Sequence, residues 1–117
     1  MINLSDIDIT LNSNLTLENI TPAMASGMTQ WNRPKSYKKG NQITCSIGIA
    51  NKITTNTPVH IATLPYLPVG DDRVLFEVFN TADNSSGHGY IDVDGKIYFN
   101  VPNNKEYYCC NFIYYCK

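Results

Sequence analysis

The sequence has little net charge of either sign. Nine basic and ten acidic residues among 117 leave a net charge of −1, and the only local basic run, from Arg33 to Lys39, contains Pro34 and leads into Gly40. Proteins that bind nucleic acid ordinarily carry a basic face that displaces counterions from phosphates. Nucleic acid is therefore not an expected partner, and we interpret the basic run as a solvated loop.

Long hydrophobic runs are also missing. No stretch approaches the roughly 20 consecutive apolar residues that a membrane helix requires. Residues 1–10 (MINLSDIDIT) lack the basic start and the apolar centre of a signal peptide. We therefore expect no membrane insertion and synthesis in a cytoplasm.

The cysteines do not follow a metal-binding pattern. They are Cys45, Cys109, Cys110 and Cys116, with neither a CxxC pair nor a Cys/His zinc spacing. Cys45 shares the odd-numbered face of residues 43–49 with three isoleucines, so we expect a buried thiol rather than a disulfide. Neighbours on a strand point to opposite faces, so one of Cys109 and Cys110, together with Cys116, is expected to be partly exposed. No metal and no cofactor are predicted.

What the sequence does contain is typical of one folded domain. A hydrophobic fraction of 43% with 16% charged residues is too apolar for a disordered chain. A length of 117 residues leaves room for a single core. We therefore predict one domain over residues 1–117, with N-terminal strands and a short helical turn in 1–28 and a larger module in 29–116.

Short alternating runs separated by Gly, Pro and Asn dominate this domain. The runs cover residues 7–10, 15–17, 43–50, 59–63, 73–79, 89–99 and 107–116. Asp94-Gly95 predicts a two-residue type I′ turn in a hairpin, and Pro22 after Thr21 predicts one helical turn near residues 22–26. The Pro-containing segment 64–69 should be a loop over the sheet. Together these signals predict an all-β protein, an antiparallel β-sandwich of jelly-roll type.

Two of the predicted strands are apolar on both faces. Residues 73–79 alternate Val74, Phe76 and Val78 with Leu75, Glu77 and Phe79, and residues 107–116 are dense in aromatics. Such strands need cover on both sides. Either a second sheet with a loop or a neighbouring subunit supplies it, and the sequence leaves both open.

The order of these pieces resembles a known family. Trp31 is followed by Tyr37-Lys38-Lys39-Gly40-Asn41, then by Ile61-Ala62-Thr63-Leu64-Pro65, and then by the hairpin with Asp94-Gly95-Lys96-Ile97. This succession, over about residues 29 to 116, is similar to the C-terminal head modules of tail-fibre, baseplate and receptor-binding proteins of tailed phages. Where that family has Gly-Tyr-Arg-Pro after the Leu-Pro, this chain has Tyr66-Leu67-Pro68-Val69-Gly70, and cysteines in the last strand are rare in the family.

The resemblance implies a receptor-binding head of a phage tail, usually a homotrimer, that adheres to saccharide on the host bacterial surface. It further implies a location in the virion and contacts with other tail or baseplate proteins. A structural trimerisation module without a ligand is the alternative, and a small glycan hydrolase is a third possibility. The family has no fixed ligand residues, so none is transferred.

Catalytic patterns are sparse, and we predict that the chain is not an enzyme. His60 alternates with apolar neighbours as a sheet residue does, and His88 lies between Gly87 and Gly89, which we interpret as an exposed loop tip. Asp71 and Asp72 follow Gly70 as turn residues do. A pair of carboxyl groups is the minimum for glycoside hydrolysis, so these two aspartates are the residues on which the hydrolase hypothesis depends.

Glycan binding needs only aromatic surfaces and planar polar side chains on accessible loops. The candidates that meet this description are Trp31, Asn32, Arg33, Tyr66, Asp71, Asp72, Asn84 and His88. For Trp31 and Tyr66, packing in the core or at a subunit interface is the competing interpretation.

Overall fold

The computed structural model describes residues 16–31, 35–102 and 104–117, and all of its regular elements are strands. The nine strands are β1 (Leu17–Ile20), β2 (Ala23–Met24), β3 (Ser36–Lys39), β4 (Gln42–Ile49), β5 (Val59–Thr63), β6 (Val74–Asn80), β7 (Ser86–Ile91), β8 (Lys96–Asn100) and β9 (Tyr108–Tyr115). The expected run at residues 7–10 lies outside the described residues. The expected strand at 59–63 is confirmed without change, and the strands expected at 43–50, 73–79 and 107–116 are confirmed with ends shifted by a residue.

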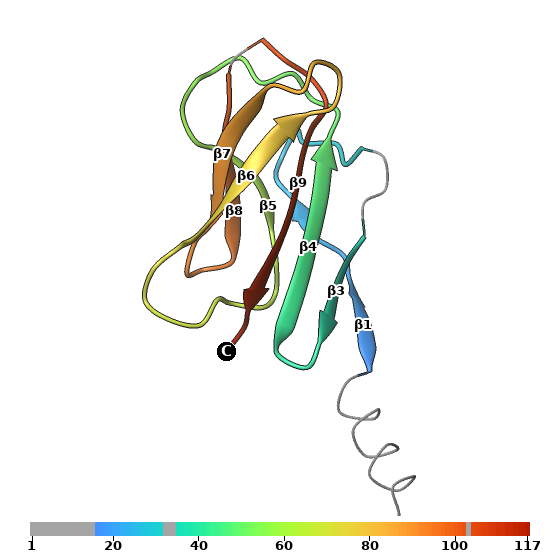
Figure 1. Cartoon of the computed structure of the whole chain (residues 1–117), viewed down its shortest axis with the longest axis vertical. Coiled ribbons are helices and arrows are strands. Elements are labelled where there is room, and N and C mark those ends of the chain that lie inside the picture. The colour runs from blue at the N-terminus through green and yellow to red at the C-terminus, as the bar shows by residue number, and fades with distance from the viewer. Residues whose placement is uncertain (1–15, 32–34, 103) are drawn as a thin grey trace, which may run out of the picture.

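All nine strands form one curled antiparallel sheet in the order β1-β3-β4-β9-β6-β7-β8-β5-β2. Its two outermost strands, β1 and β2, are consecutive in the chain and are separated only by Thr21 and Pro22. The sheet must therefore curl until its edges meet, which gives two packed layers around one core (Figure 1). The all-β, sandwich-like fold predicted from the sequence is confirmed.

The concave side of the sheet forms the core. On β4 the odd-numbered residues from Ile43 to Ile49, including Cys45, have no exposed surface, whereas Gln42, Thr44 and Ser46 between them are half-buried. This period-two pattern is the one expected of a strand with one face buried. The interpretation of Cys45 as a buried free thiol is confirmed.

The helical turn predicted at residues 22–26 is wrong. Ala23 and Met24 pair with Thr63 and Ala62 of β5, and the amide of Ala25 donates to the carbonyl of Ile61 at 2.9 Å. A single helical turn fixes several residues for one hydrogen bond, so the exposed edge of β5 is the better partner for this backbone. The chain turns only afterwards, at Gly27, where φ is 82°.

The predicted hairpin is present, but its turn is of another kind. Ile91 pairs with Ile97, and the amide of Gly95 donates to the carbonyl of Asp92 at 2.9 Å. Of the turn residues only Gly95 has a positive φ, 86°, so the two-residue type I′ turn on Asp94-Gly95 is not formed. The longer loop with glycine in the left-handed position serves the same purpose.

The chain covers β6 and β9 on one face only. Val78, Cys110 and Tyr114 are buried, whereas the outward side chains Leu75, Ile113 and Tyr115 are 73%, 52% and 63% exposed. Within the described residues no loop crosses this outer face, so intramolecular cover of both faces is not observed. The partial exposure expected of Cys116 is also wrong, because Cys116 is buried while Cys109 is half-buried.

Candidate functional site

Three outward side chains on adjacent strands form a polar row across the outer face of the sheet. Glu77 of β6 pairs with His88 of β7, and His88 pairs with Asn100 of β8. Directly paired residues of antiparallel strands project to the same side, here the convex side. Glu77 and His88 are exposed and Asn100 is half-buried. We call these three residues the polar row.

The glycines on either side of His88 belong to β7, which corrects the loop-tip interpretation. A Cβ on Gly89 would lie 2.4 Å from the Phe76 ring, and one on Gly87 would lie 2.7 Å from the Val101 side chain. Both glycines therefore make room for inward-facing apolar side chains. The strand stays regular, and His88 is held at its centre on the outer face.

Shallow depressions flank the polar row. One of about 370 Å³ is lined on the β8 side by Asn56, Asn100 and Pro102, and another of about 290 Å³ is lined on the β6 side by Leu75, Phe76 and Glu77. Both share Ser86, Gly87 and His88. His88 thus lines both hollows.

The side chains of the polar row have no partners among the residues that the structure describes. None of the three side chains makes a hydrogen bond or an ion pair there. The row therefore offers a carboxylate as acceptor, an imidazole as donor and acceptor, and an amide as both. These groups are hydrogen-bonding capacity directed at solvent or at a ligand.

Next to the polar row, aromatic rings stack across three strands. Tyr90 and Tyr98 have ring centroids 5.0 Å apart, and Tyr98 lies 5.5 Å from the ring of His60. The guanidinium of Arg73 lies over the ring of Tyr90 at 4.1 Å from its centroid. These rings are therefore engaged with one another and with Arg73. We call these four residues the aromatic ladder.

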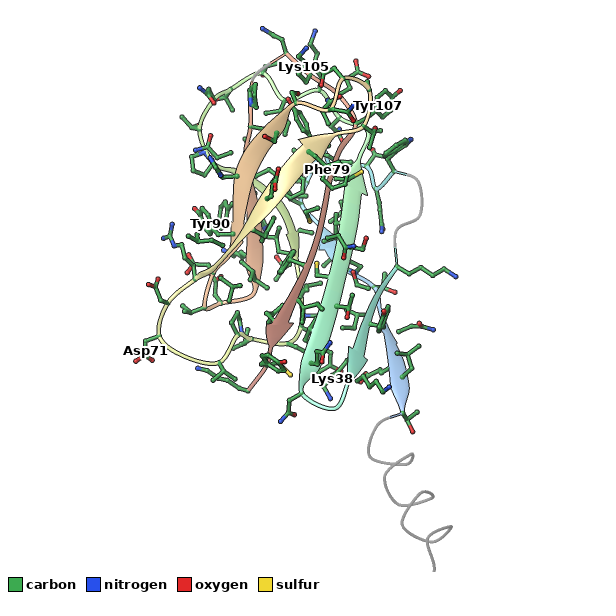
Figure 2. The ribbon with its side chains drawn as sticks, viewed as in Figure 1. Lys38, Asp71, Phe79, Tyr90, Lys105 and Tyr107 are labelled. Carbon is green, nitrogen blue, oxygen red and sulfur yellow. The ribbon has the colours of Figure 1, made fainter. Side chains whose placement is uncertain are left out.

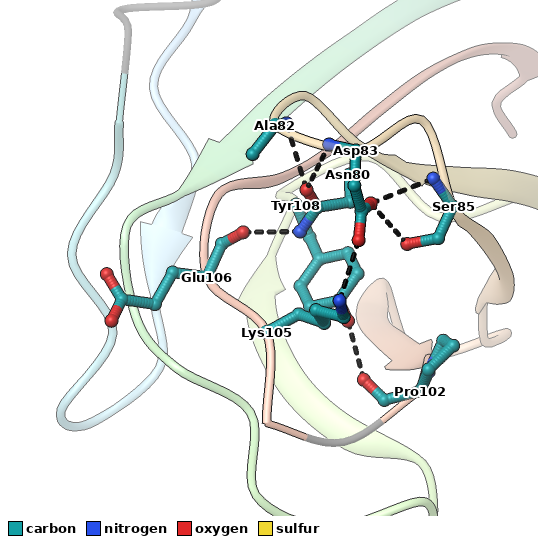
Figure 3. A network of polar contacts seen from close by, with 8 residues as sticks. All are labelled: Asn80, Ala82, Asp83, Ser85, Pro102, Lys105, Glu106 and Tyr108. Carbon is teal, nitrogen blue, oxygen red and sulfur yellow. Dashed lines mark hydrogen bonds and ion pairs between the residues drawn. The ribbon is translucent and has the colours of Figure 1, made fainter.

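At the end of β6 a second group of polar side chains is hydrogen-bonded to the backbone and to one another (Figure 3). The side chain of Asn80 accepts bonds from the amides of Ala82 and Asp83 and donates to the carbonyl of Glu106. The carboxylate of Asp83 lies 2.7 Å from Lys105 Nζ. Bonds from Lys105 and then from Ser85 hold the pKa of the Asp83 carboxyl well below its usual range. This Asn80 network ties the β6–β7 turn to the segment before β9.

Two of the predicted loop aromatics are engaged in packing. The ring of Trp31 lies 5.1 Å from that of Tyr107 and close over Gly48. The hydroxyl of Tyr66 donates to Glu18 at 2.6 Å, and its ring lies 5.3 Å from Lys38 Nζ. These contacts are the packing roles that the sequence left open.

The remaining predicted residues are dispersed. Asp71 and Asp72 are exposed in the loop before β6, and Asp72 accepts a 2.8 Å bond from the amide of Arg73. Asn84 is exposed in the β6–β7 turn with φ of 60°, while Asn32 and Arg33 lie outside the described residues. Figure 2 places Asp71 at the lower end of the molecule, Tyr90 on its side and Tyr107 at the upper end. Only His88 among the predicted residues belongs to the polar row.

A further hollow of about 380 Å³ lies between β1 and β3. It is lined by apolar Ile20 and Pro22 together with Asn19, Gln30, Lys35 and Ser36. The hydroxyl of Ser36 is already bonded to the backbone of Ser46 at 2.9 Å and 3.2 Å. The exposed side chains of Asn19, Thr21 and Lys35 have no partner among the described residues, so this hollow also offers hydrogen-bonding groups to a ligand.

Within residues 16–31, 35–102 and 104–117, no three residues of the types His, Cys, Asp and Glu gather in an arrangement that would hold a metal ion. No helix in those ranges is long and apolar enough to cross a membrane.

Sequence reasoning missed Glu77 and Asn100. The alternation of residues 73–79 did place Glu77 on the face opposite Val78. The two-residue turn expected at Asp94-Gly95 would have put Val101 opposite His88, whereas the observed longer loop shifts the register by one residue and brings Asn100 there. The polar row therefore could not be assembled from the sequence alone.

Comparison with known proteins bears on the fold. No protein-family model and no curated protein sequence matches the chain. Among solved structures, the crystal structure of the receptor binding protein (gp15) of Listeria phage PSA superposes with a TM-score of 0.71 at 18% sequence identity. The match covers 97% of this chain and 73% of that one. The two proteins share a fold. At this identity the similarity extends to the fold alone.

Proposed function

We propose that this chain is the receptor-binding head of a phage tail and adheres to saccharide on the surface of the host bacterium. The observation that carries the proposal is the fold shared with a phage receptor binding protein over 97% of the chain. The order of sequence pieces from Trp31 to the last strand favours the same family on separate grounds. In this proposal the protein is made in the bacterial cytoplasm and acts in the virion, beside other tail or baseplate proteins.

The exposed polar row can serve a binding role. Its carboxylate, imidazole and amide have no partner in the described part of the chain and are hydrated in the free protein, so they can exchange water for the hydroxyl groups of a ligand. The side chain of Asn80, by contrast, is buried and bonded to the backbone.

Self-association into a homotrimer is part of the proposal. Val69, Ile113 and Tyr115 are 58%, 52% and 63% exposed, and the amide of Val69 donates to the carbonyl of Tyr115, so the three lie together near the C-terminal end of β9. Exposed apolar groups of this kind are typical of surfaces that pack against a partner. Three copies would also multiply weak contacts with a repeating polysaccharide.

A structural trimerisation module is the second candidate, favoured by the same exposed apolar side chains. The hydrolase hypothesis has less support. Asp71 and Asp72 are neighbours in one exposed loop, and the carboxylate of Asp72 already accepts the amide of Arg73.

The test is adhesion of the labelled whole chain to a panel of bacterial strains and to their purified cell-wall polysaccharides. We expect binding to some strains, abolished when the cells are treated with periodate, which cleaves vicinal diols of sugars, and retained after protease treatment. Light scattering of the same sample should report a mass near three times 13.1 kDa.

Each part of the proposal has its own contrary result. Adhesion to no strain would favour the structural module. Binding that survives periodate and is lost with protease would point to a protein receptor, and release of sugar that depends on Asp71 or Asp72 would favour the hydrolase. A monomer that still binds would refute the homotrimer and leave the rest of the proposal standing.

A further inference from the structure

We propose that the receptor saccharide lies on the strands rather than the loops, across the polar row of Glu77, His88 and Asn100, and that it is a neutral sugar. This inference rests on the proposed function and assigns it a site and a ligand chemistry. Of the candidate residues identified from the sequence, only His88 belongs to this site.

The dimensions of the row suit a short stretch of polysaccharide. Neighbouring strands lie about 4.8 Å apart, so the three side chains extend over roughly 10 Å along a line that crosses the strands. The two depressions meet at His88: one is lined by β7, the end of β8 and Asn56, and the other by β6 and β7. Two linked sugar rings can therefore occupy the two hollows, with the imidazole between them.

The chemistry of the surface matches the two kinds of surface that a sugar has. Sugar hydroxyls bond best to planar polar groups, which the carboxylate, imidazole and amide supply. Apolar side chains flank the row: Phe79 is 40% exposed on one side, and Leu75, on the other, is 73% exposed and pairs with Tyr90. These side chains face the C–H groups of a sugar lying along the row.

The charge of the row selects against acidic sugars. Glu77 is its only formally charged member at neutral pH, and a carboxylate or phosphate on the ligand would be repelled by it. Arg73, the cation of the aromatic ladder, is engaged with the ring of Tyr90. We therefore assign a neutral saccharide, whose hydroxyl groups donate hydrogen bonds to the Glu77 carboxylate.

The row is also unsuited to an extended peptide. β7 is hydrogen-bonded to β6 on one side and to β8 on the other, so no free strand edge is available for a peptide to join. The depressions are open and shallow and contain no deep pocket for a side-chain anchor. A protein receptor therefore fits this face less well than a sugar does.

The row is pre-organised by the strands that carry it. Register fixes the spacing of its members, and Gly87 and Gly89 keep β7 flat against Val101 and Phe76. Little conformational entropy then remains to be lost on binding, apart from that of three side chains. This makes specific recognition possible without a loop that must be ordered.

The experiment measures binding of the whole chain to purified polysaccharide from a strain to which the wild type adheres. E77A, H88A and N100A should each weaken binding by about tenfold or more, because each removes a hydrogen-bonding partner of the sugar. N19A is the matched control, since Asn19 is also an exposed strand asparagine but lies on β1, at the edge of the sheet and outside both depressions. D71A and Y66F represent the loops. All three should stay within about twofold of the wild type.

Competition with hydrolysed polysaccharide, divided by anion exchange into neutral and acidic fragments, tests the ligand class. The neutral fraction should displace the chain and the acidic fraction should not. Wild-type binding with unchanged H88A and N100A, or loss in D71A instead, overturns the site and leaves the proposed function standing. Displacement by the acidic fraction overturns the neutral-sugar assignment. Absence of wild-type adhesion to every strain overturns the function and the inference together.

Discussion

The two halves of strand β6 use their polar side chains in opposite ways. At its end, Asn80 is 1% exposed and is bonded to three backbone groups. Three residues earlier, Glu77 projects outward beside His88 without a partner among the described residues. The first arrangement stabilises the fold, because burial without those bonds would be costly. The second leaves its polar groups hydrated and accessible to a ligand.

The difference teaches how to separate structural from functional polar residues in this protein. Residue type and exposure alone do not distinguish the two kinds of polar residue. Tyr66 and Asp83 are both polar, yet Tyr66 is hydrogen-bonded to Glu18 and Asp83 forms an ion pair with Lys105. What separates them is whether the donors and acceptors are already paired.

Replacing Gly89 by alanine should cost the most stability. The new Cβ would meet the Phe76 ring at 2.4 Å and the carbonyl oxygen of Tyr98 at 2.8 Å, and the carbonyl cannot move away. We expect a loss of about 3 kcal/mol in the free energy of unfolding, measured with urea. The double variant F76A/G89A should lose less than the sum of the two single variants. Full additivity would contradict the proposed clash with Phe76.

Replacing Asn80 by alanine should cost about 2 kcal/mol, because buried backbone groups lose their partner. N111A is the control and should change the free energy of unfolding by less than about 0.5 kcal/mol, since Asn111 is exposed. Polysaccharide binding by folded N80A should equal that of the wild type. Equal stability of N80A and N111A would remove the structural role assigned to the network.

The Asp83–Lys105 pair should make stability depend on acidity. The folded-state pKa of Asp83 is depressed, so its contribution is present above the unfolded value of about 4 and is lost as the pH falls toward the folded value. Between pH 5 and about 2 the wild type should therefore lose stability more steeply than D83N. The difference in the free energy of unfolding between the wild type and D83N should also become smaller in about 1 M salt, which screens exposed charges. Parallel pH profiles would show that the pair does not couple to folding.

Replacing His88 by alanine should change stability least, by less than about 0.5 kcal/mol, because the exposed imidazole has no partner in the described structure. Its effect should be confined to polysaccharide binding. A large loss of stability in H88A would place His88 with Asn80 among the structural residues and would end the distinction between them.

The fold could largely be predicted from the sequence, since period-two runs and turn residues located most strands. The helical turn at residues 22–26 could not be predicted correctly, because the competing hydrogen bonds come from β5, about 40 residues later in the chain. The prediction of the turn type at Asp94-Gly95 was wrong for a similar reason, since the register between β7 and β8 determines the length of the loop. Local sequence does not encode such distant partners.

The candidate site was predicted only in part. His88 was identified as exposed, but the two glycines were taken for signs of a loop, whereas they accommodate Phe76 and Val101 beneath the strand. Glu77 and Asn100 become functional candidates only when three strands are placed in register. The predicted loop residues were chosen by type, and type does not reveal whether Tyr66 or Asp72 is already hydrogen-bonded.

The most direct test of the central claim is an amide NMR titration of the whole chain with neutral oligosaccharides released from the cell wall of a strain that it binds. We predict that the largest shift changes fall on Glu77, His88, Asn100 and their neighbours on β6, β7 and β8. Changes confined to the loops around Trp31, Asp71 and Asn84, with the polar row unaffected, would contradict the account.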